Sequence, residues 1–325
     1  MKPFTIQDAS NQRDASQQVG DAVFLAGGTT LVDLMKLDLQ RPDRIINLLP
    51  LREKLNGIRV DEAGLTIGAL VTMSELMDHS IVQERYAVMY DALRLAASAQ
   101  IRNAATIGGN LLQRTRCAYY RDKHAACNKH SPGSGCAATG GDSRGLAILG
   151  TSKHCIANYA GDLAVALVAL DASVTTADAD GAERKLKVED LHRLPGDQPH
   201  IETNLKPGEL ITHIHVPHQT WDKTLYHKVR DRASYAFALT SAAVALRRRQ
   251  EVIDEVRIAL GGLATKPWRC RAAEAYLQGK ALTMATATKA AELCLEGAQT
   301  DSYRAFKVEL GKRTVIRALL NVNNF

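Results

Sequence analysis

Apolar and polar residues near the start of the chain change from a strand pattern to a helix pattern at a pair of glycines. An apolar run at residues 23–25 is followed by Gly-Gly-Thr-Thr at 27–30, and apolar residues recur at helical spacing from Leu31. This pattern predicts a strand, a tight turn and a helix. Either Thr29 or Thr30 is expected to cap the free N–H groups at the start of that helix.

Short elements continue the pattern. Strands are predicted at residues 44–48, 58–60 and 65–67, the last two separated by an Asp-Glu-Ala-Gly turn. Thr72 heads a short helix through Leu76, and the apolar positions then predict one longer helix from about residue 82 to 97. The first part of the chain is therefore expected to mix helices with short strands.

A second pair of glycines, Gly108 and Gly109, lies among small polar residues at 101–111. Glycine has no Cβ, so an anion such as a pyrophosphate can approach the backbone amides of either turn. Neither turn has the spacing of the dinucleotide-binding G-x-G-x-x-G motif or of the P-loop, so we assign neither site. A glycine pair between a strand and a helix is also common as a purely structural turn.

Residues 113–154 break the regular pattern and have little apolar periodicity. They contain three cysteines, and Cys155 closes the segment. A loop of this length needs a source of order other than apolar packing. Tyr119, Tyr120 and the thiols argue against simple disorder.

Regular periodicity resumes at Asp162, which is placed to cap a helix or to accept a hydrogen bond from a ligand hydroxyl. Strands are predicted at 173–176 and 209–217. A domain boundary is placed near Trp221, after which the pattern predicts an α+β domain. Its sheet is expected at 225–229, 237–246 and 252–260, and its helices at 271–277, 284–295 and 303–320.

Composition and charge narrow the class of protein. The 325 residues carry a net charge of +6, with a pI near 9.0 and 46% hydrophobic residues, which is typical of a globular protein with two or three cores. The segment from 112 to 155 holds seven basic and two acidic residues, so its net charge of +5 is nearly the whole excess. No run is long enough to span a membrane, and residues 1–6 have neither the apolar stretch nor the twin arginine of an export signal.

The four clustered cysteines have the spacing C-x9-C-x8-C-x18-C, which matches no standard zinc or ferredoxin motif. Four soft ligands on a poorly packed loop can close around a metal, and the binding energy then orders the loop. Zinc and an iron–sulfur cluster both remain open, as do reduced thiols or two disulfides. A negatively charged iron–sulfur cluster would give the surrounding positive charge a local reason. His124, His130 and His154 are further possible ligands, although loop histidines commonly have no such role.

Four stretches together resemble the FAD-binding (medium) subunit of the molybdenum hydroxylases, the xanthine dehydrogenase and carbon monoxide dehydrogenase family. They are residues 25–31, 106–111, 161–164 and 226–236, and the resemblance extends over essentially the whole chain. The chain is most similar to the branch of periplasmic aldehyde oxidoreductases whose four-cysteine insertion carries a 4Fe–4S cluster. One departure is Gly161, where the family often has serine, so a hydroxyl contact to the cofactor would be missing.

The resemblance implies an α+β fold with a two-part FAD-binding domain of the vanillyl-alcohol-oxidase type over 1–219, including an iron–sulfur insertion at 113–155. A C-terminal α+β domain, an antiparallel sheet with helices, would follow over 220–325. It also implies the cofactor ligands. FAD would contact Ala26, Gly27, Gly28, Thr29, Thr30, Leu31, Thr106, Gly109, Asn110, Asp162, Leu210, Ile211 and Lys228. The cluster would be held by Cys117, Cys127, Cys136 and Cys155.

In this interpretation residues 26–31 hold the pyrophosphate, Asp162 binds ribose or ribityl hydroxyls, and Leu210 or Ile211 packs near the flavin. The ammonium of Lys228 would stabilise negative charge on the reduced flavin. From the pattern alone, Lys228 is more simply a solvated lysine on a strand. No nucleophile or general base accompanies the glycine turns, which favours a redox relay over substrate chemistry.

The implied function is that of an oxidoreductase subunit for electron transfer. An aldehyde would be oxidised at a molybdenum cofactor on a large subunit, and electrons would pass through 2Fe–2S centres of a small subunit to FAD and an external acceptor. We expect the periplasm, reached by co-export with a signal-bearing partner, or otherwise the cytoplasm. The alternatives are a free-standing flavin oxidase or reductase, and a four-thiolate zinc module that binds nucleic acid. The leading interpretation, by contrast, expects neither a nucleic-acid partner nor a membrane span.

Overall fold

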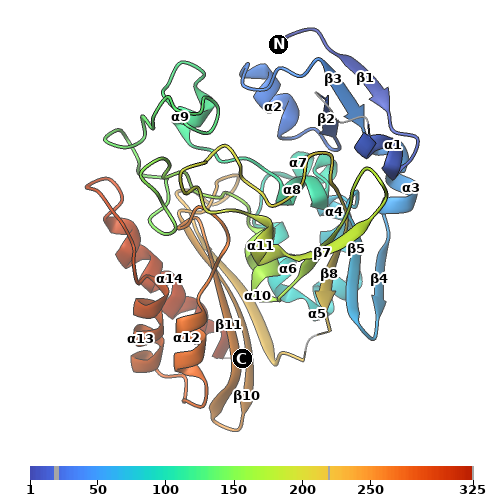
Figure 1. Cartoon of the computed structure of the whole chain (residues 1–325). Helices are drawn as coiled ribbons and strands as arrows, with labels where there is room; N and C mark the ends of the chain where they lie inside the picture. The colour runs from blue at the N-terminus through green and yellow to red at the C-terminus, as the bar shows by residue number, and fades with distance from the viewer. Residues whose placement is uncertain (18–21, 219, 324–325) are drawn as a thin grey trace.

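A three-stranded parallel sheet opens the chain in the computed structural model, which describes residues 1–17, 22–218 and 220–323 (Figure 1). The strand order is β1-β3-β2. The elements are β1 (Thr5–Asp8), α1 (Gln12–Gln17), β2 (Ala22–Leu25), α2 (Leu31–Lys36) and β3 (Arg44–Asn47). The predicted strand, glycine turn and helix are therefore present. The predicted cap is wrong, because Thr30 occupies the N-cap position of α2 without a side-chain hydrogen bond.

A five-stranded antiparallel sheet forms the second part of the N-terminal half. Its strands, in spatial order, are β4 (Ile58–Asp61), β5 (Gly64–Gly68), β8 (Leu210–Pro217), β6 (Ser173–Ala177) and β7 (Glu183–Lys187). The sequence pattern misses β7, which is an edge strand of mainly charged residues. Such residues are common at edges because they discourage pairing with other chains.

Short helices pack on this sheet. They are α4 (Met73–Asp78), α5 (Ser80–Arg85), α6 (Ala87–Arg94), α7 (Ala99–Ala104) and α8 (Ile107–Leu111). The predicted helix start at Thr72 is confirmed, and Thr72 and Glu75 form a reciprocal capping box there. The single helix expected over 82–97 is wrong, because the backbone leaves the helical region at Tyr86 (φ −126°, ψ 49°) and separates α5 from α6.

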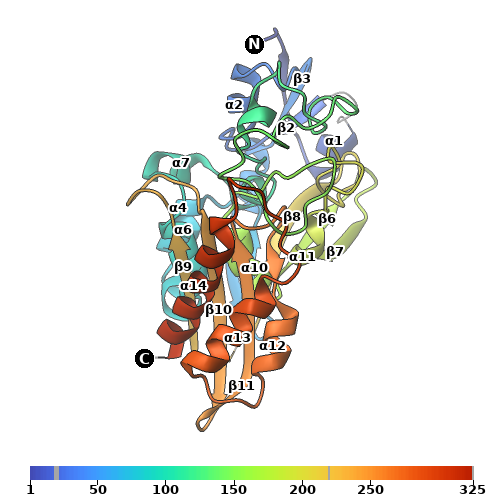
Figure 2. The ribbon, with the colours of Figure 1, turned by 90° about the vertical axis from the view of Figure 1, so that its left-hand side faces the viewer.

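Helix α10 (Leu163–Ala169) lies at the centre of the molecule (Figures 1 and 2), and all seven of its residues are buried. A helix that is apolar on every side is expected where other elements surround it. It contacts α6 on one side and the strands β10 and β11 of the third sheet on the other. The core of the N-terminal half therefore continues into the C-terminal half through α10.

The third sheet is antiparallel, in the order β12-β11-β10-β9, and three helices cover its other face. The strands are β9 (Lys223–Val229), β10 (Thr240–Arg249), β11 (Val252–Gly261) and β12 (Trp268–Arg269); the helices are α12 (Arg271–Leu277), α13 (Met284–Cys294) and α14 (Phe306–Asn323). On β10, Ala243 and Ala245 face α10, whereas Val244 and Leu246 join the core under the helices. The predicted α+β class is confirmed.

Four short helices complete the described elements: η1 (Leu49–Leu51), α3 (Arg52–Leu55), α9 (Ala118–Arg121) and α11 (Val188–Leu191). Helix α9 belongs to the segment 113–155, which Figure 1 shows as green loops beside α2 and above the C-terminal helices. In the ranges that the structure covers, no helix combines the length and apolar character needed to cross a membrane.

Candidate functional site

The turn between β2 and α2 presents a row of unpaired backbone donors. Among the described residues, no acceptor takes the amide hydrogens of Gly27 through Leu31. Gly28 has a φ of 72°, which lets the backbone turn there without the strain that a side chain would bring. A Cβ on Gly27 would lie 1.9 Å from the carbonyl oxygen of Ala104, so the turn sits directly against the end of α7. Five consecutive free amides at a helix start fit a bound anion.

This turn forms one wall of a cavity of about 260 Å³. Leu210 and Ile211 at the start of β8 line it as well, together with Thr106 and Gly109 from the start of α8. The rest of the wall is mainly apolar: Phe24, Leu34, Leu48, Leu55 and Leu70. The structure thus brings together ten of the thirteen predicted FAD ligands. An apolar pocket bordered by free amides suits an aromatic ring attached to a phosphate.

A larger cavity of about 710 Å³ adjoins the first, because Thr29, Thr30 and Gly109 line both. Asn110 and Asp162 line the larger one. The Asn110 side-chain oxygen is buried and has no hydrogen-bond donor among the described residues. A buried unpaired acceptor costs free energy unless a ligand supplies the donor. The two cavities together therefore fit an extended dinucleotide, with the amide-rich turn at their junction.

The second glycine pair works differently from the first. Gly108 and Gly109 lie inside helix α8, and the Gly108 N–H donates to the Ala69 carbonyl at 2.9 Å. The Gly109 N–H donates to the Thr106 hydroxyl at 3.3 Å. The expectation that this segment exposes backbone donors is therefore wrong. A Cβ on Gly108 would lie 3.0 Å from the Ala69 Cβ, so this glycine permits close packing of α8.

Gly161 has a similar packing reason. A Cβ there would lie 2.7 Å from the Tyr159 ring and 2.8 Å from the Gln113 side-chain nitrogen. A serine at this position would need its neighbours to move. The glycine at position 161, where the family often has serine, therefore fits the close packing around it.

Asp162 makes a buried ion pair that the sequence does not reveal. Its carboxylate accepts from the Lys228 ammonium at 2.8 Å and from the Tyr226 hydroxyl at 2.7 Å, and Lys228 also donates to the Leu95 carbonyl at 3.0 Å. Burial raises the pKa of Asp162, and the Lys228 ammonium acts against that rise. Asp162 makes no capping hydrogen bond to α10, so that predicted role is wrong.

Lys228 is not one of the described residues that line the two cavities, and its side chain is only 1% exposed. The interpretation as a solvated strand lysine is therefore wrong. Its predicted position beside the flavin ring stays a prediction. In the structure it holds the Asp162 carboxylate at the wall of the larger cavity.

Glu209 is a cavity residue that the sequence analysis missed. It lines the smaller cavity immediately before β8, and its carboxylate accepts from Arg184, from the Thr176 hydroxyl and from the Lys206 N–H. Burial by itself would raise the pKa of Glu209, but these hydrogen bonds outweigh it and lower the pKa to about 2. A charged residue before a strand is too common a pattern to have singled it out.

We expect Glu209→Gln to lower the free energy of unfolding by about 1–3 kcal/mol at pH 7, because Arg184 and Thr176 lose a charged acceptor. The folded-state pKa lies below the unfolded value, so the native carboxylate stabilises the fold above pH 4.5. That contribution is lost as the pH falls from about 4.5 to about 2. Denaturant unfolding of both proteins at pH 7 and pH 3 measures the difference.

The matched control is Glu62→Gln, which neutralises an exposed carboxylate in the turn between β4 and β5. It should leave stability within about 0.5 kcal/mol of wild type at both pH values. A Glu209→Gln difference that stays constant between pH 7 and pH 3 would contradict the assigned ion pair.

The four clustered cysteines pack into one separate core. Cys117, Cys127 and Cys155 are buried in it, and the half-buried Cys136 packs against it. Cys127 and Cys136 face each other across an isolated antiparallel bridge. Burial raises the pKa of Cys117, and it raises the pKa of Cys155 to about 11, with smaller contributions from Cys127 and Cys136 in both cases. The thiols that the sequence separates are therefore neighbours in space.

Asn128 connects the pieces of this segment, and no sequence pattern pointed to it. Its side-chain oxygen accepts from the N–H groups of Gly133 and Gly135 at 3.1 and 2.9 Å. Its side-chain nitrogen donates to the His154 carbonyl at 3.0 Å. One side chain thereby ties the turn before Cys136 to the residue before Cys155.

Carboxylates from other parts of the chain pair with most of the positive charge of the segment. Arg116 and Arg121 contact Asp33, Lys123 contacts Asp38, Arg114 and Lys129 contact Glu202, and Arg144 contacts Asp231. The predicted local excess of +5 is therefore largely balanced in the fold. This balanced charge gives little support to a nucleic-acid-binding surface. Because carboxylates already pair with most of it, an iron–sulfur cluster is not needed to explain the whole of the positive charge.

No group of three or more His, Cys, Asp or Glu side chains within the described ranges has the arrangement of a site for a metal ion. Four thiolates around a cluster of four irons stand farther apart than four around one zinc ion, because the irons and sulfides lie between them. Four neighbouring thiols nevertheless supply the sulfur donors that both zinc and iron–sulfur clusters use.

Two family models match the chain. The model of the FAD binding domain in molybdopterin dehydrogenase matches residues 1–219. The model of the CO dehydrogenase flavoprotein C-terminal domain matches residues 225–322.

Individual proteins agree with these models. The chain is 45% identical to the aldehyde oxidoreductase FAD-binding subunit PaoB of Escherichia coli (strain K12), with 98% of each chain covered. It is 30% identical to the glyceraldehyde dehydrogenase medium chain of Sulfolobus acidocaldarius, over 79% of this chain and 74% of the other. Its fold resembles that of a carbon monoxide dehydrogenase chain from Hydrogenophaga pseudoflava, with a TM-score of 0.77, 25% identity, and 99% and 98% of the two chains covered.

Proposed function

Because the chain belongs to the family of FAD-binding subunits of the molybdenum hydroxylases, we propose that it is the electron-transfer subunit of a molybdenum-dependent aldehyde oxidoreductase. We propose that it binds FAD and one 4Fe–4S cluster. The observation that carries the FAD assignment is the row of free amides from Gly27 to Leu31 at the junction of two cavities. When bound, FAD exchanges electrons in pairs or singly, which suits a relay between different redox partners.

The residues of this chain bind and orient the dinucleotide. The amides from Gly27 to Leu31 donate to the pyrophosphate, as the positive end of α2 favours. Leu210 and Ile211 offer apolar contact in the smaller cavity. In the larger cavity the unpaired Asn110 oxygen accepts a hydrogen bond from the ligand, and the Asp162 carboxylate accepts from a ribityl or ribose hydroxyl. The Lys228 ammonium donates to that carboxylate and holds it in place.

The proposal of a 4Fe–4S cluster rests on Cys117, Cys127, Cys136 and Cys155. The four residues lie in one apolar pocket, and the Ala157 N–H donates to the Cys155 sulfur at 3.4 Å. Hydrogen bonds to the ligand sulfurs and a dry environment are the means by which proteins adjust such clusters. Burial raises the pKa of the Cys155 thiol, and cluster binding would release the protons of the ligand thiols.

The proposed partners are a large subunit with the molybdenum cofactor and a small subunit with 2Fe–2S centres. An aldehyde oxidoreductase subunit and a glyceraldehyde dehydrogenase chain among the relatives support this class of complex. The external electron acceptor would meet the flavin. Export together with a signal-bearing partner stays a prediction, which cell fractionation of the assembled complex tests.

The experiment is an absorption spectrum of anaerobically purified protein with flavin, iron, sulfide and zinc measured on the same sample. We expect about one FAD and about four irons per chain, with flavin bands above a broad iron–sulfur shoulder. Zinc without flavin would overturn the proposal in favour of the thiolate module. Steeply salt-dependent nucleic-acid binding would then be expected as well.

The same preparation separates the relay from a free-standing flavin enzyme. A relay subunit should show almost no aldehyde turnover alone and should gain activity when both partner subunits are added. Substantial turnover by the isolated chain would favour the oxidase or reductase instead.

A further inference from the structure

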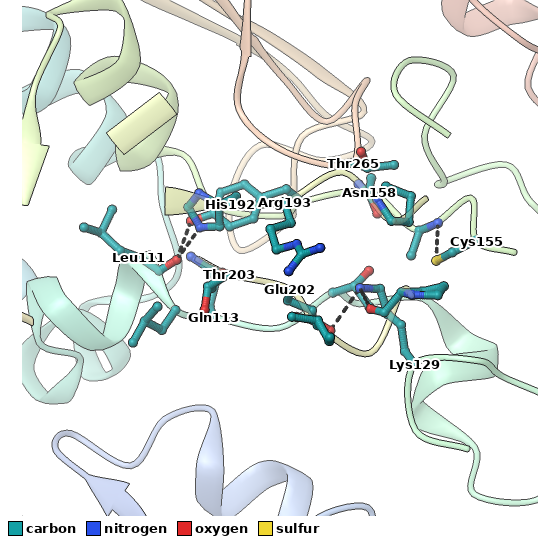
Figure 3. A pocket seen from close by; sticks show the side chains of 17 residues that line it. Leu111, Gln113, Lys129, Cys155, Asn158, His192, Arg193, Glu202, Thr203 and Thr265 are labelled. Atoms are coloured by element: carbon teal, nitrogen blue, oxygen red, sulfur yellow. Dashed lines mark hydrogen bonds and ion pairs between the residues drawn. The ribbon is translucent and has the colours of Figure 1, made fainter. Parts of the chain in front are cut away.

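A small cavity of about 40 Å³ (Figure 3) is lined by Cys155 of the cysteine pocket and shares Leu112 with the smaller FAD cavity. Leu111, the last residue of α8, and Gln113 lie at one end of it in Figure 3, and Cys155 lies at the other, with Glu202 between them. Gln113 also lines the larger FAD cavity. The polar groups of this cavity are therefore placed between the two proposed redox sites.

Two cationic side chains meet at the Glu202 carboxylate. The Lys129 ammonium lies 3.0 Å from one Glu202 carboxylate oxygen, and the Arg114 guanidinium lies 2.8 Å from the other. Lys129 also donates to the Pro199 carbonyl at 3.0 Å. Burial raises the pKa of Glu202, but Arg114 and Lys129 outweigh it and hold the pKa below its usual value. One carboxylate thus fixes two cations in the interior, with one positive charge in excess.

Both cations lie beside predicted cluster ligands. Lys129 lines the cavity together with Cys155 and lies two positions after Cys127 in the chain. Arg114 interacts electrostatically with Cys127 and stacks over the Tyr120 ring at 5.0 Å. Arg114 also lines the smaller FAD cavity. The side chain of Lys129 is only 12% exposed, so water screens its charge weakly.

We propose that Lys129, held in place by Glu202, raises the reduction potential of the iron–sulfur centre at Cys155. The inference rests on the proposed cluster and adds a residue that acts on it through space. Reduction adds one electron to the cluster and breaks no bond, so the reduced form carries one more negative charge. A buried cation at a fixed distance stabilises the more negative form, and the effect is large where the dielectric constant is low.

The test is a potentiometric titration of the anaerobically purified chain, followed by electron paramagnetic resonance of the reduced cluster. We expect Lys129→Gln to lower the reduced-to-oxidised ratio at a fixed potential about tenfold, which corresponds to about 59 mV for a one-electron couple. Lys129→Arg keeps the charge and should restore a potential near wild type. The matched control is Lys153→Gln, since Lys153 is exposed although it is also two residues from a predicted ligand. It should leave the potential unchanged.

An unchanged potential in iron-loaded Lys129→Gln would overturn the inference, as would an equal shift in Lys153→Gln. If Lys129→Gln loses its iron, Glu202→Gln supplies the measurement. The Pro199 carbonyl still binds the Lys129 ammonium in this variant, so loss of the anion should move the potential upward. A lowered or unchanged potential in Glu202→Gln would refute the proposed influence of Lys129 and Glu202 on the cluster. Wild-type protein without iron would instead refute the proposed cluster, so the two failures are distinguishable.

Discussion

Gly27→Ala should purify without bound FAD. A methyl group at this position would lie 1.9 Å from the Ala104 oxygen and 2.7 Å from the Ala104 carbonyl carbon, and both are backbone atoms. The turn can relieve this overlap only by moving away from α7, which displaces the row of free amides. Overpacking of this kind typically costs about 1–3 kcal/mol, and a contact with backbone lies at the upper end. Because about 1.4 kcal/mol is a factor of ten, we expect FAD affinity to fall by about a hundredfold or more.

The measurement is the ratio of flavin to protein after purification, followed by fluorescence titration of the apoprotein with FAD. Gly57→Ala is the matched control, because a Cβ there would meet nothing closer than a side-chain atom at 3.6 Å and the residue does not line the FAD cavities. It should keep a full complement of flavin. Circular dichroism establishes that both variants fold. Normal FAD content in folded Gly27→Ala would contradict the assignment of this turn as the pyrophosphate site.

The parts of the site that sequence could predict are those in which neighbouring residues act together. The turn at 26–31 is read from an apolar run, two glycines and a helical period, all within one short stretch. Leu210 and Ile211 could be assigned only by family resemblance, yet they face the same cavity as the turn. The helix after Asp162 is equally local, since its seven residues are all apolar.

The parts that sequence could not predict depend on pairing between distant residues. Lys228 looks like an ordinary strand lysine until β9 brings it against Asp162, which lies 66 positions earlier. Likewise, the charge of the cysteine segment appears unbalanced because Asp33, Asp38, Glu202 and Asp231 all lie outside it. No period or motif records such contacts, since each involves single polar residues on different elements.

Backbone geometry accounts for the remaining differences between the predicted and the observed elements. The break at Tyr86 leaves the apolar spacing of α5 and α6 nearly continuous, so the sequence pattern reads them as one helix. The second glycine pair has the composition of an open turn, but α8 forms because Ala69 and Val71 accept from its first amides. In both cases tertiary contacts decide between two local structures that the sequence permits.

Cys136→Ala should lose most of the bound iron and sulfide while largely retaining FAD. Cys136 is the least buried of the four thiols, and it sits directly opposite Cys127 across the isolated bridge. Removal of one thiolate leaves one iron without its protein ligand, and the cluster then no longer closes the loop. FAD should remain because its main contacts, the turn at 26–31, α8 and the start of β8, all lie outside residues 113–155.

Loss of the cluster should also loosen the segment, because few apolar side chains other than those in the cysteine pocket hold it together. Limited proteolysis should therefore cut Cys136→Ala within residues 113–155 much faster than wild type, and iron and flavin assays on the same sample give the cofactor content. Cys294→Ala is the matched control, since it removes a buried thiol from the C-terminal core and should leave iron unchanged. Equal iron in Cys136→Ala and wild type would refute the ligand assignment. Loss of FAD together with iron would instead mean that the cysteine pocket supports the flavin site, and the two cofactors would then have to be assigned to one cooperative unit.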